Sequence, residues 1–162
     1  MLEKLDFDSS GSIASPIGAV NVYAKGDAVV FLTMSGAVAP TIGSSSAVDS
    51  ALSQLGEYFA GKRTVLDFKV RPSGTSFQEA VWAEIAKIPF GQTVSYADIA
   101  RAIGKPLASR AVGGAVGSNP VPLVIGCHRV MGASGRITGY SGGDGIPTKR
   151  WLLAHERIAS VD

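Results

Sequence analysis

The helical part of the chain centres on residues 95–116, with the sequence SYADIARAIGKPLASRAVGGAV. Ser95 followed by Asp98 is a helix-start signature, apolar residues then recur at helical spacing, and Gly104 predicts the end of that helix. A second short helix is expected from about residue 107 to residue 116. Two short helices joined by a Gly-containing turn are typical of a helix-turn-helix, although enzymes that never touch DNA use the same hairpin.

The second of these helices consists almost entirely of small residues. Glycines such as Gly113 and Gly114 each cost about 1 kcal/mol in a helix relative to alanine, so the composition needs a reason. One reason is close packing against a neighbouring helix. The other is a thin helix that enters a narrow groove, with its only long side chain, Arg110, as a probe. A helix that reads bases in the major groove carries several long polar side chains, so sequence-specific recognition is disfavoured.

The N-terminal part has the patterns of a small sheet and one helix. Residues 18–24 and 28–34 are alternating or β-branched runs around a short turn, which predicts a hairpin. Apolar residues from 48 to 59 recur at spacings of three and four, which predicts an amphipathic helix. Residues 64–70 predict a third strand. No residue pattern in this part indicates a reactive site, so we interpret it as scaffold.

Charge and glycine are unevenly distributed along the 162 residues. Residues 1–75 carry a net charge of −1, whereas residues 76–162 carry +3 and 12 of the 20 glycines. We therefore expect a scaffold domain of residues 1–75 and a second domain of residues 76–162. The second domain is expected to open with a helix, which Ser76 and Glu79 would start as a capping box and Pro89 would end.

Composition excludes several classes of protein. Hydrophobic residues make up 46% and charged residues 17%, which is too apolar for a disordered chain, and a net charge of +2 disfavours a histone-like binder. The single cysteine, Cys127, excludes an internal disulfide and a multi-cysteine zinc site. Neither a signal peptide nor a run of eighteen apolar residues is present, so the sequence predicts a cytoplasmic protein without membrane contact.

That cysteine ends an apolar, strand-like run, NPVPLVIGCHRV, at residues 119–130. A buried lone cysteine is usually inert, but the adjacent His128 favours a nucleophile, because the reactive form is the thiolate and a base must generate it. Neighbouring residues of a strand point to opposite sides, so His128 would act on Cys127 only from a loop or through a water molecule. Glu156, on a later helix, is the candidate carboxylate to orient the imidazole.

The motifs of this part, taken in order, closely resemble those of the O6-alkylguanine-DNA alkyltransferases. The specific matches are SY at 95–96, RAVGGA at 110–115, NP at 119–120, GCHRV at 126–130, GYSGG at 139–143 and WLL at 151–153. Weaker matches are SPIG at 15–18, FQ at 77–78, VW at 81–82 and IPFG at 88–91. The resemblance implies an α+β fold in which a small RNase H-like domain of sheet and helix packs on a helical C-terminal domain with a helix-turn-helix.

The resemblance also implies an activity. Family members bind duplex DNA that contains O6-alkylguanine, and O4-alkylthymine is an expected second substrate. They flip the damaged base out of the stack and transfer its alkyl group irreversibly to cysteine, once per molecule. This chemistry needs no cofactor and no metal. One monomer suffices for it, and cooperative assembly on DNA is left open.

Individual roles follow residue by residue from the same resemblance. The implied catalytic residues are the nucleophile Cys127, the base His128 acting through a water, the orienting carboxylate Glu156, and Tyr96, which donates a hydrogen bond or proton to guanine. The implied DNA-binding residues are Ser95, Arg110, Ala111 and Gly113, with Arg110 filling the gap in the base stack. The implied substrate-pocket residues are Asn119, Val130, Tyr140, Ser141 and Lys149, of which Asn119 would brace the cysteine loop.

One departure from the family pattern lies beside the nucleophile. The family usually has proline immediately before the cysteine, whereas this chain has Gly126, so we expect a looser loop with its chemistry intact. Cys127 occupies the position at which non-catalytic alkyltransferase-like proteins have tryptophan, which favours a transferase. The alternatives are a non-catalytic binder of alkylated DNA, a helix-turn-helix regulator and a cysteine hydrolase, for which we see no second base.

Overall fold

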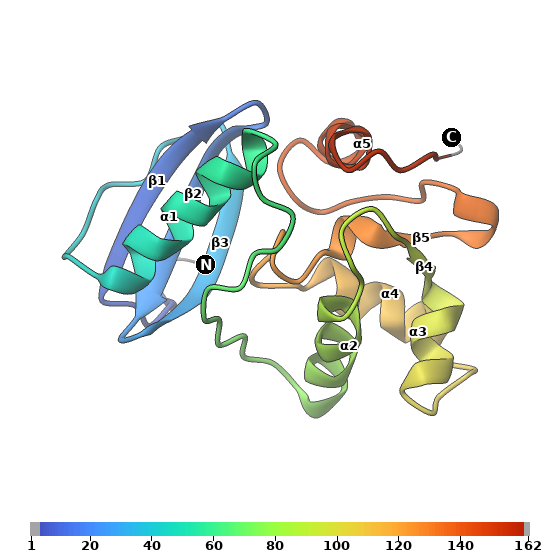
Figure 1. Ribbon diagram of the computed structural model, residues 1–162. Helices are drawn as coiled ribbons and strands as arrows, with labels where there is room; N and C mark the ends of the chain where they lie inside the picture. Colours follow the sequence, from blue (N-terminus) through green and yellow to red (C-terminus); the bar gives the residue numbers. More distant parts are fainter. Residues whose placement is uncertain (1–3, 161–162) are drawn as a thin grey trace. The chain divides into compact units, whose positions relative to one another are not determined.

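The computed structural model describes residues 4–160 and has an α+β fold (Figure 1). The chain forms two compact units, one ending at Pro72 and the other beginning at Ser73. Within residues 4–160, none of the helices combines the length and the apolar character that crossing a membrane requires.

The first unit is a three-stranded antiparallel sheet with one helix. Strands β1 (Ser9–Ser15), β2 (Gly18–Lys25) and β3 (Ala28–Ser35) lie in the order β1-β2-β3. Helix α1 (Ser46–Phe59) crosses one face of this sheet (Figure 1). The hairpin and the helix that the sequence predicts are confirmed, and the Ser15–Gly18 motif forms the turn between β1 and β2.

The predicted third strand at residues 64–70 is wrong. Of that run only Val70 pairs with the sheet, through a single parallel bridge to Val29. The third strand is β1, whose sequence SSGSIAS lacks a strand-like apolar pattern. Strand β1 fits against α1 because its side chains are small: a Cβ at Gly11 would lie 2.9 Å from Cγ1 of Val48 on α1. Close approach of the helix therefore selects this segment.

The second unit begins with α2 (Ser76–Ala86). Its capping box starts one residue earlier than predicted, because Thr75 rather than Ser76 is the N-cap. Gln78 N donates to Thr75 Oγ1 at 3.1 Å, and Thr75 N donates to Gln78 Oε1 at 2.9 Å. Trp82 Nε1 of α2 donates to the Ala115 carbonyl at 2.8 Å, which ties this helix to the small-residue helix.

The helix-turn-helix consists of α3 (Tyr96–Ala102) and α4 (Ser109–Gly117). Ser95 and Asp98 form the predicted capping box on α3. Gly104 ends that helix with a φ of +76°, a conformation that glycine adopts without strain. Helix α4 begins two residues later than expected.

A short parallel pairing sets the geometry of the second unit. Strand β4 (Val94–Ser95) leads directly into α3, and β5 (Val130–Met131) directly follows the 3₁₀ turn η2 (Cys127–Arg129). Because β4 pairs with β5, the start of α3 is held next to the cysteine turn. The chain continues through a second 3₁₀ turn, η3 (Ala133–Gly135), to the last helix, α5 (Ile146–His155), whose C-cap is Glu156.

Candidate active site

The segment that leads to Cys127 is a turn, not the strand that its apolar composition suggests. Ile125 N donates to the Val121 carbonyl at 3.1 Å, and the chain reverses around Leu123, which has a φ of +78°. Asn119 braces this turn: its Nδ2 donates to the Ile125 carbonyl at 2.7 Å, and its Oδ1 accepts from Val121 N at 3.0 Å. The turn delivers Cys127 to the start of η2, nearly buried at 4% exposure.

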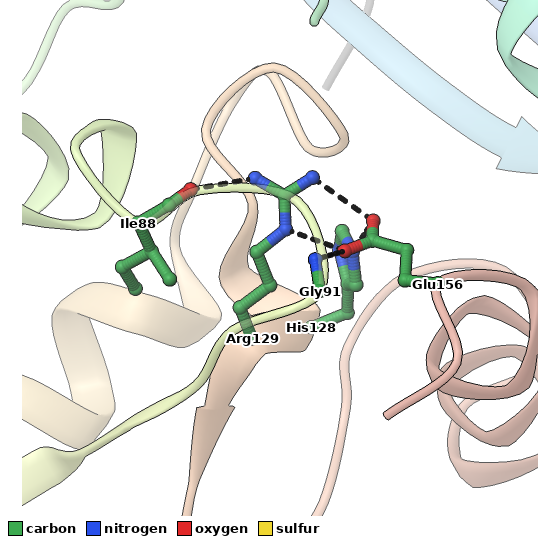
Figure 2. Close-up of polar contacts among 5 residues, drawn as sticks. All are labelled: Ile88, Gly91, His128, Arg129 and Glu156. Carbon is green, nitrogen blue, oxygen red and sulfur yellow. Dashed lines mark hydrogen bonds and ion pairs between the residues drawn. The ribbon is translucent and has the colours of Figure 1, made fainter. Parts of the chain in front are cut away.

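A buried ionic cluster lies beside the cysteine turn (Figure 2). His128 Nε2 is 2.7 Å from Glu156 Oε2, and both side chains are fully buried. Arg129 donates to the same carboxylate through Nε at 2.8 Å and Nη2 at 2.9 Å, and through Nη1 to the Ile88 carbonyl at 2.8 Å. Gly91 N also donates to this carboxylate, at 3.1 Å from Glu156 Oε1.

This arrangement determines the protonation of His128. Burial lowers the pKa of His128, and although Glu156 acts in the opposite direction, the nearby Arg129 charge lowers the pKa further. The imidazole is therefore neutral at pH 7. A carboxylate can only accept, so Nε2 carries the proton that is donated to Glu156, and Nδ1 is the basic nitrogen. Within residues 4–160, Nδ1 is buried and has no hydrogen-bond partner.

Opposing effects act on the Cys127 thiol. Burial raises the pKa of Cys127, while hydrogen bonds from Asn119 and Tyr140 and the positive charge of Lys149 lower it. Lys149 is buried, and its Nζ donates to the carbonyls of Val130 at 2.7 Å and Gly139 at 3.2 Å. The resting group is thus a thiol that has a cation and two hydrogen-bonding groups in place to stabilise the thiolate.

Cys127 opens onto a pocket of about 260 Å³. This volume is just below the range of about 300–1,000 Å³ of drug-sized ligand sites, which suits a small planar group. The walls come from both helices of the helix-turn-helix and from the segment after η3. The lining residues are Tyr96, Gly113, Val116, Gly117, Cys127, Gly139, Tyr140 and Ser141.

Helix α4 presents two different faces. Val112, Ala115 and Val116 are buried, whereas Arg110 and Ala111 are exposed. Of the two explanations for the small residues, close packing does not account for the glycines: a Cβ at Gly113 would lie 4.0 Å from the Tyr96 ring, an ordinary contact distance, and Cβ atoms at Gly114 and Gly117 would meet nothing within 4 Å. The same helix thus forms a wall of the cysteine pocket and an exposed surface beside it.

Comparison with known families identifies this arrangement. Residues 76–158, which contain the helix-turn-helix and the whole cysteine site, match the family described as 6-O-methylguanine DNA methyltransferase, DNA binding domain. The chain belongs to the 6-O-methylguanine DNA methyltransferase family. The resemblance drawn from the sequence motifs is confirmed.

Relatives of the family extend the match beyond this domain. The chain is 51% identical over 107 residues to the methylated-DNA–protein-cysteine methyltransferase of Mycolicibacterium paratuberculosis, and 50% identical over 111 residues to that of Mycobacterium tuberculosis. These alignments cover 66% and 68% of this chain, and 64% and 66% of the relatives, so the chain matches slightly less than two thirds of their length.

Solved structures match over a longer span. The O6-methylguanine methyltransferase of M. tuberculosis superposes with a TM-score of 0.80 at 41% identity, covering 93% of this chain and 94% of that one. A structure of the M. tuberculosis protein in complex with DNA gives a TM-score of 0.82 at 43% identity, covering 91% and 92%. The α+β fold expected from the sequence is that of these methyltransferases.

The structure brings most of the predicted site residues of this methyltransferase-family chain together, but not all of them line the pocket. The predicted residues that line the pocket are Tyr96, Gly113, Cys127, Tyr140 and Ser141. Other predicted residues lie behind the pocket wall or outside it. Cys127 or its neighbours are supported from behind by Asn119, His128, Lys149 and Glu156, and the buried Val130 accepts a hydrogen bond from Lys149 at its carbonyl. Ser95 caps α3. The exposed face of α4 carries Arg110 and Ala111.

Arg129 is the functional candidate that sequence reasoning missed. It follows Cys127 and His128 directly, but nothing in the sequence shows that it shares a carboxylate with His128. Two signals were available: Arg129 lies inside the GCHRV motif at 126–130, and the IPFG segment at 88–91, a weak family match, supplies the Ile88 carbonyl and the Gly91 amide to this cluster. Arg129 neutralises Glu156, and this allows His128 to stay uncharged.

Gly126 has a conformation that proline also adopts. Its φ is −71° and its ψ is 64°, an inverse γ-turn closed by the bond from Cys127 N to the Ile125 carbonyl at 2.7 Å. What distinguishes glycine here is space, since a Cβ would lie 3.0 Å from Arg129 Nη1 and 3.2 Å from its Cδ. The loop is therefore held by the turn and by Arg129, and the looseness expected from Gly126 stays an untested prediction.

Changing Gly126 to proline is expected to leave the rate of alkyl transfer within about threefold of wild type. The φ angle already suits proline. A stiffer unfolded chain raises the stability of the fold by about 0.4–1 kcal/mol, and this gain opposes the destabilisation caused by crowding of Arg129. Single-turnover kinetics and urea unfolding measure both effects. Gly126→Ala adds the same Cβ without the ring, so a large loss of rate in both variants would show that glycine is required, whereas a loss in Gly126→Pro alone would show that the ring is not tolerated.

Proposed function

We propose that this protein repairs DNA by direct reversal, transferring the alkyl group of O6-alkylguanine in duplex DNA irreversibly to Cys127. The main support is a nucleobase-sized pocket that has a single thiol in its wall and a buried imidazole–carboxylate pair beside that thiol. The relatives named as methylated-DNA–protein-cysteine methyltransferases support the same reaction. We expect O4-alkylthymine to be a second substrate, since its alkyl group can be displaced by the same chemistry.

The reaction is a displacement at the alkyl carbon. The thiol proton of Cys127 passes through a water molecule to His128 Nδ1, and Glu156 holds the imidazole in the tautomer that leaves this nitrogen basic. Sulfur then forms a bond to the alkyl carbon as the bond from that carbon to O6 breaks. The electron pair of the broken bond returns to guanine, which takes up one proton, and Tyr96 donates a hydrogen bond to the base. A thioether offers no leaving group, so each molecule reacts once.

DNA is expected to bind over the exposed face of α4. This helix also lines the pocket through Gly113, Val116 and Gly117, so a base that leaves the stack next to α4 has a short path to Cys127. Arg110 is exposed on the same helix, and we expect it to fill the vacated position in the stack. The M. tuberculosis relative solved in complex with DNA supports this partner.

All groups of the proposed reaction lie within one unit of one chain, so a monomer suffices. A nucleophilic cysteine must stay reduced, which favours the cytoplasm as the site of action.

Intact mass spectrometry tests the proposal. After incubation with duplex DNA that contains one O6-methylguanine, the protein is expected to gain one methyl group, mapped to Cys127 by peptide sequencing. The same duplex with ordinary guanine is the control and should leave the mass unchanged. Tight binding to methylated DNA without a mass change would instead support a non-catalytic damage binder, and equal binding to one unmodified sequence would support a regulator.

A further inference from the structure

The hydroxyl of Tyr96 has a neighbour that none of the motifs includes. Thr138 follows η3, and its Oγ1 donates to Tyr96 Oη at 3.2 Å. A phenol oxygen can accept one hydrogen bond while donating another. When Tyr96 Oη accepts from Thr138, its own proton is directed elsewhere, and Tyr96 lines the pocket that contains Cys127.

The Thr138 side chain is held in one orientation by packing. Its Cγ2 methyl lies 2.6 Å from where a Cβ of Gly132 would be, so the methyl occupies the space that the missing side chain leaves. Because threonine carries two heavy atoms on Cβ, placing the methyl also places the hydroxyl. The hydroxyl then points at Tyr96.

The backbone of Tyr96 is held in place as well. Its ring faces Gly113 on α4 across open space, since even a Cβ there would lie 4.0 Å from the ring. Its backbone begins α3 directly after the Ser95 cap, and β4 holds that cap against β5. The backbone of Tyr96 is therefore fixed, and at the other end of the side chain Thr138 restricts rotation of the O–H bond.

We propose that Thr138 is a positioning residue for the transfer reaction, which orients the Tyr96 hydroxyl so that its proton faces the base in the pocket. This inference rests on the proposed alkyl transfer and adds a residue to it. Thr138 is exposed in the free protein, where water competes for its hydroxyl. DNA bound over α4 excludes that water and strengthens the bond when the reaction needs it.

The test compares Thr138→Val with wild type in single-turnover methyl transfer at increasing concentrations of methylated duplex. Valine keeps the methyl and the shape but removes the donor. The maximal transfer rate is expected to fall about threefold to tenfold, the worth of one hydrogen bond, with the half-saturating DNA concentration unchanged. Thr138→Ser keeps the donor but lacks the methyl that places it, so it is expected to restore part of the rate, and Thr64→Val, at an exposed threonine of the first unit, is expected to have no effect.

A double-mutant cycle with Tyr96→Phe separates this role from a structural one. Phenylalanine has no hydroxyl to orient, so adding Thr138→Val to Tyr96→Phe is expected to cause no further loss of rate. The inference is overturned if Thr138→Val lowers the rate further in that background, or if Thr138→Val alone leaves the rate unchanged. It is also overturned if Thr138→Ser restores none of the rate, or if only DNA affinity changes. If wild type itself takes no methyl group, the proposed function fails instead.

Discussion

Replacing Cys127 with serine is expected to abolish methyl transfer from O6-methylguanine while DNA binding stays within about threefold of wild type. Cys127 is the only cysteine of the chain, so no second thiol can substitute for it. A serine hydroxyl is far less acidic than a thiol, and a neutral histidine does not generate enough alkoxide to displace guanine from a methyl group. The helix that we expect to bind DNA does not depend on the thiol.

The variant is compared with wild type by intact mass after prolonged incubation with methylated duplex, and by fluorescence anisotropy with the same duplex. Serine is nearly isosteric with cysteine, and Asn119 and Tyr140, which help to lower the pKa of the thiol, are polar neighbours for the hydroxyl as well. We therefore expect the melting temperature to change little. A methyl adduct on Cys127→Ser would place the acceptor on another residue and contradict the proposed chemistry.

Changing Glu156 to glutamine is expected to damage both stability and reaction. The carboxylate accepts hydrogen bonds from His128, from Gly91 and twice from Arg129, with no exposure to solvent. An amide keeps one acceptor atom and presents an NH₂ group to donors. Removing one partner of a buried ion pair costs about 3–5 kcal/mol, because the Arg129 charge is left uncompensated.

The reaction is expected to slow by about a hundredfold or more, the usual contribution of a positioned general base. The glutamine NH₂ group favours the His128 tautomer in which Nε2 accepts and Nδ1 carries the proton, and that tautomer cannot take the proton of Cys127. Urea unfolding measures the stability. Single-turnover transfer is then measured at a temperature at which the variant is folded.

Glu84→Gln is a matched control for this change. Glu84 pairs with Lys87 on the surface of α2, where an ion pair contributes little, so neither the stability nor the transfer rate should change appreciably. Folded Glu156→Gln that transfers methyl within threefold of wild type would show that the carboxylate is structural and that His128 does not need its orientation.

The sequence predicted those features that depend on residues close together in the chain. The capping box at Ser95, the turn at Gly104 and the apolar stripe of α1 are local patterns, and each appears in the structure. Prediction failed where local patterns were ambiguous. Thr75 and Ser76 both suit a helix N-cap, and the apolar run before Cys127 suits a strand as well as a buried turn.

The other features of the fold and of the site depend on packing between residues that are far apart in the sequence. A serine-rich segment becomes β1 because Gly11 admits α1, and this competition between segments is invisible in local composition. The proposed nucleophile and its proposed base are adjacent in the sequence, as Cys127 and His128. The charge state of that base depends on Glu156 and Arg129, which meet across 27 positions of the chain and are both buried, so that solvent screens their charges weakly.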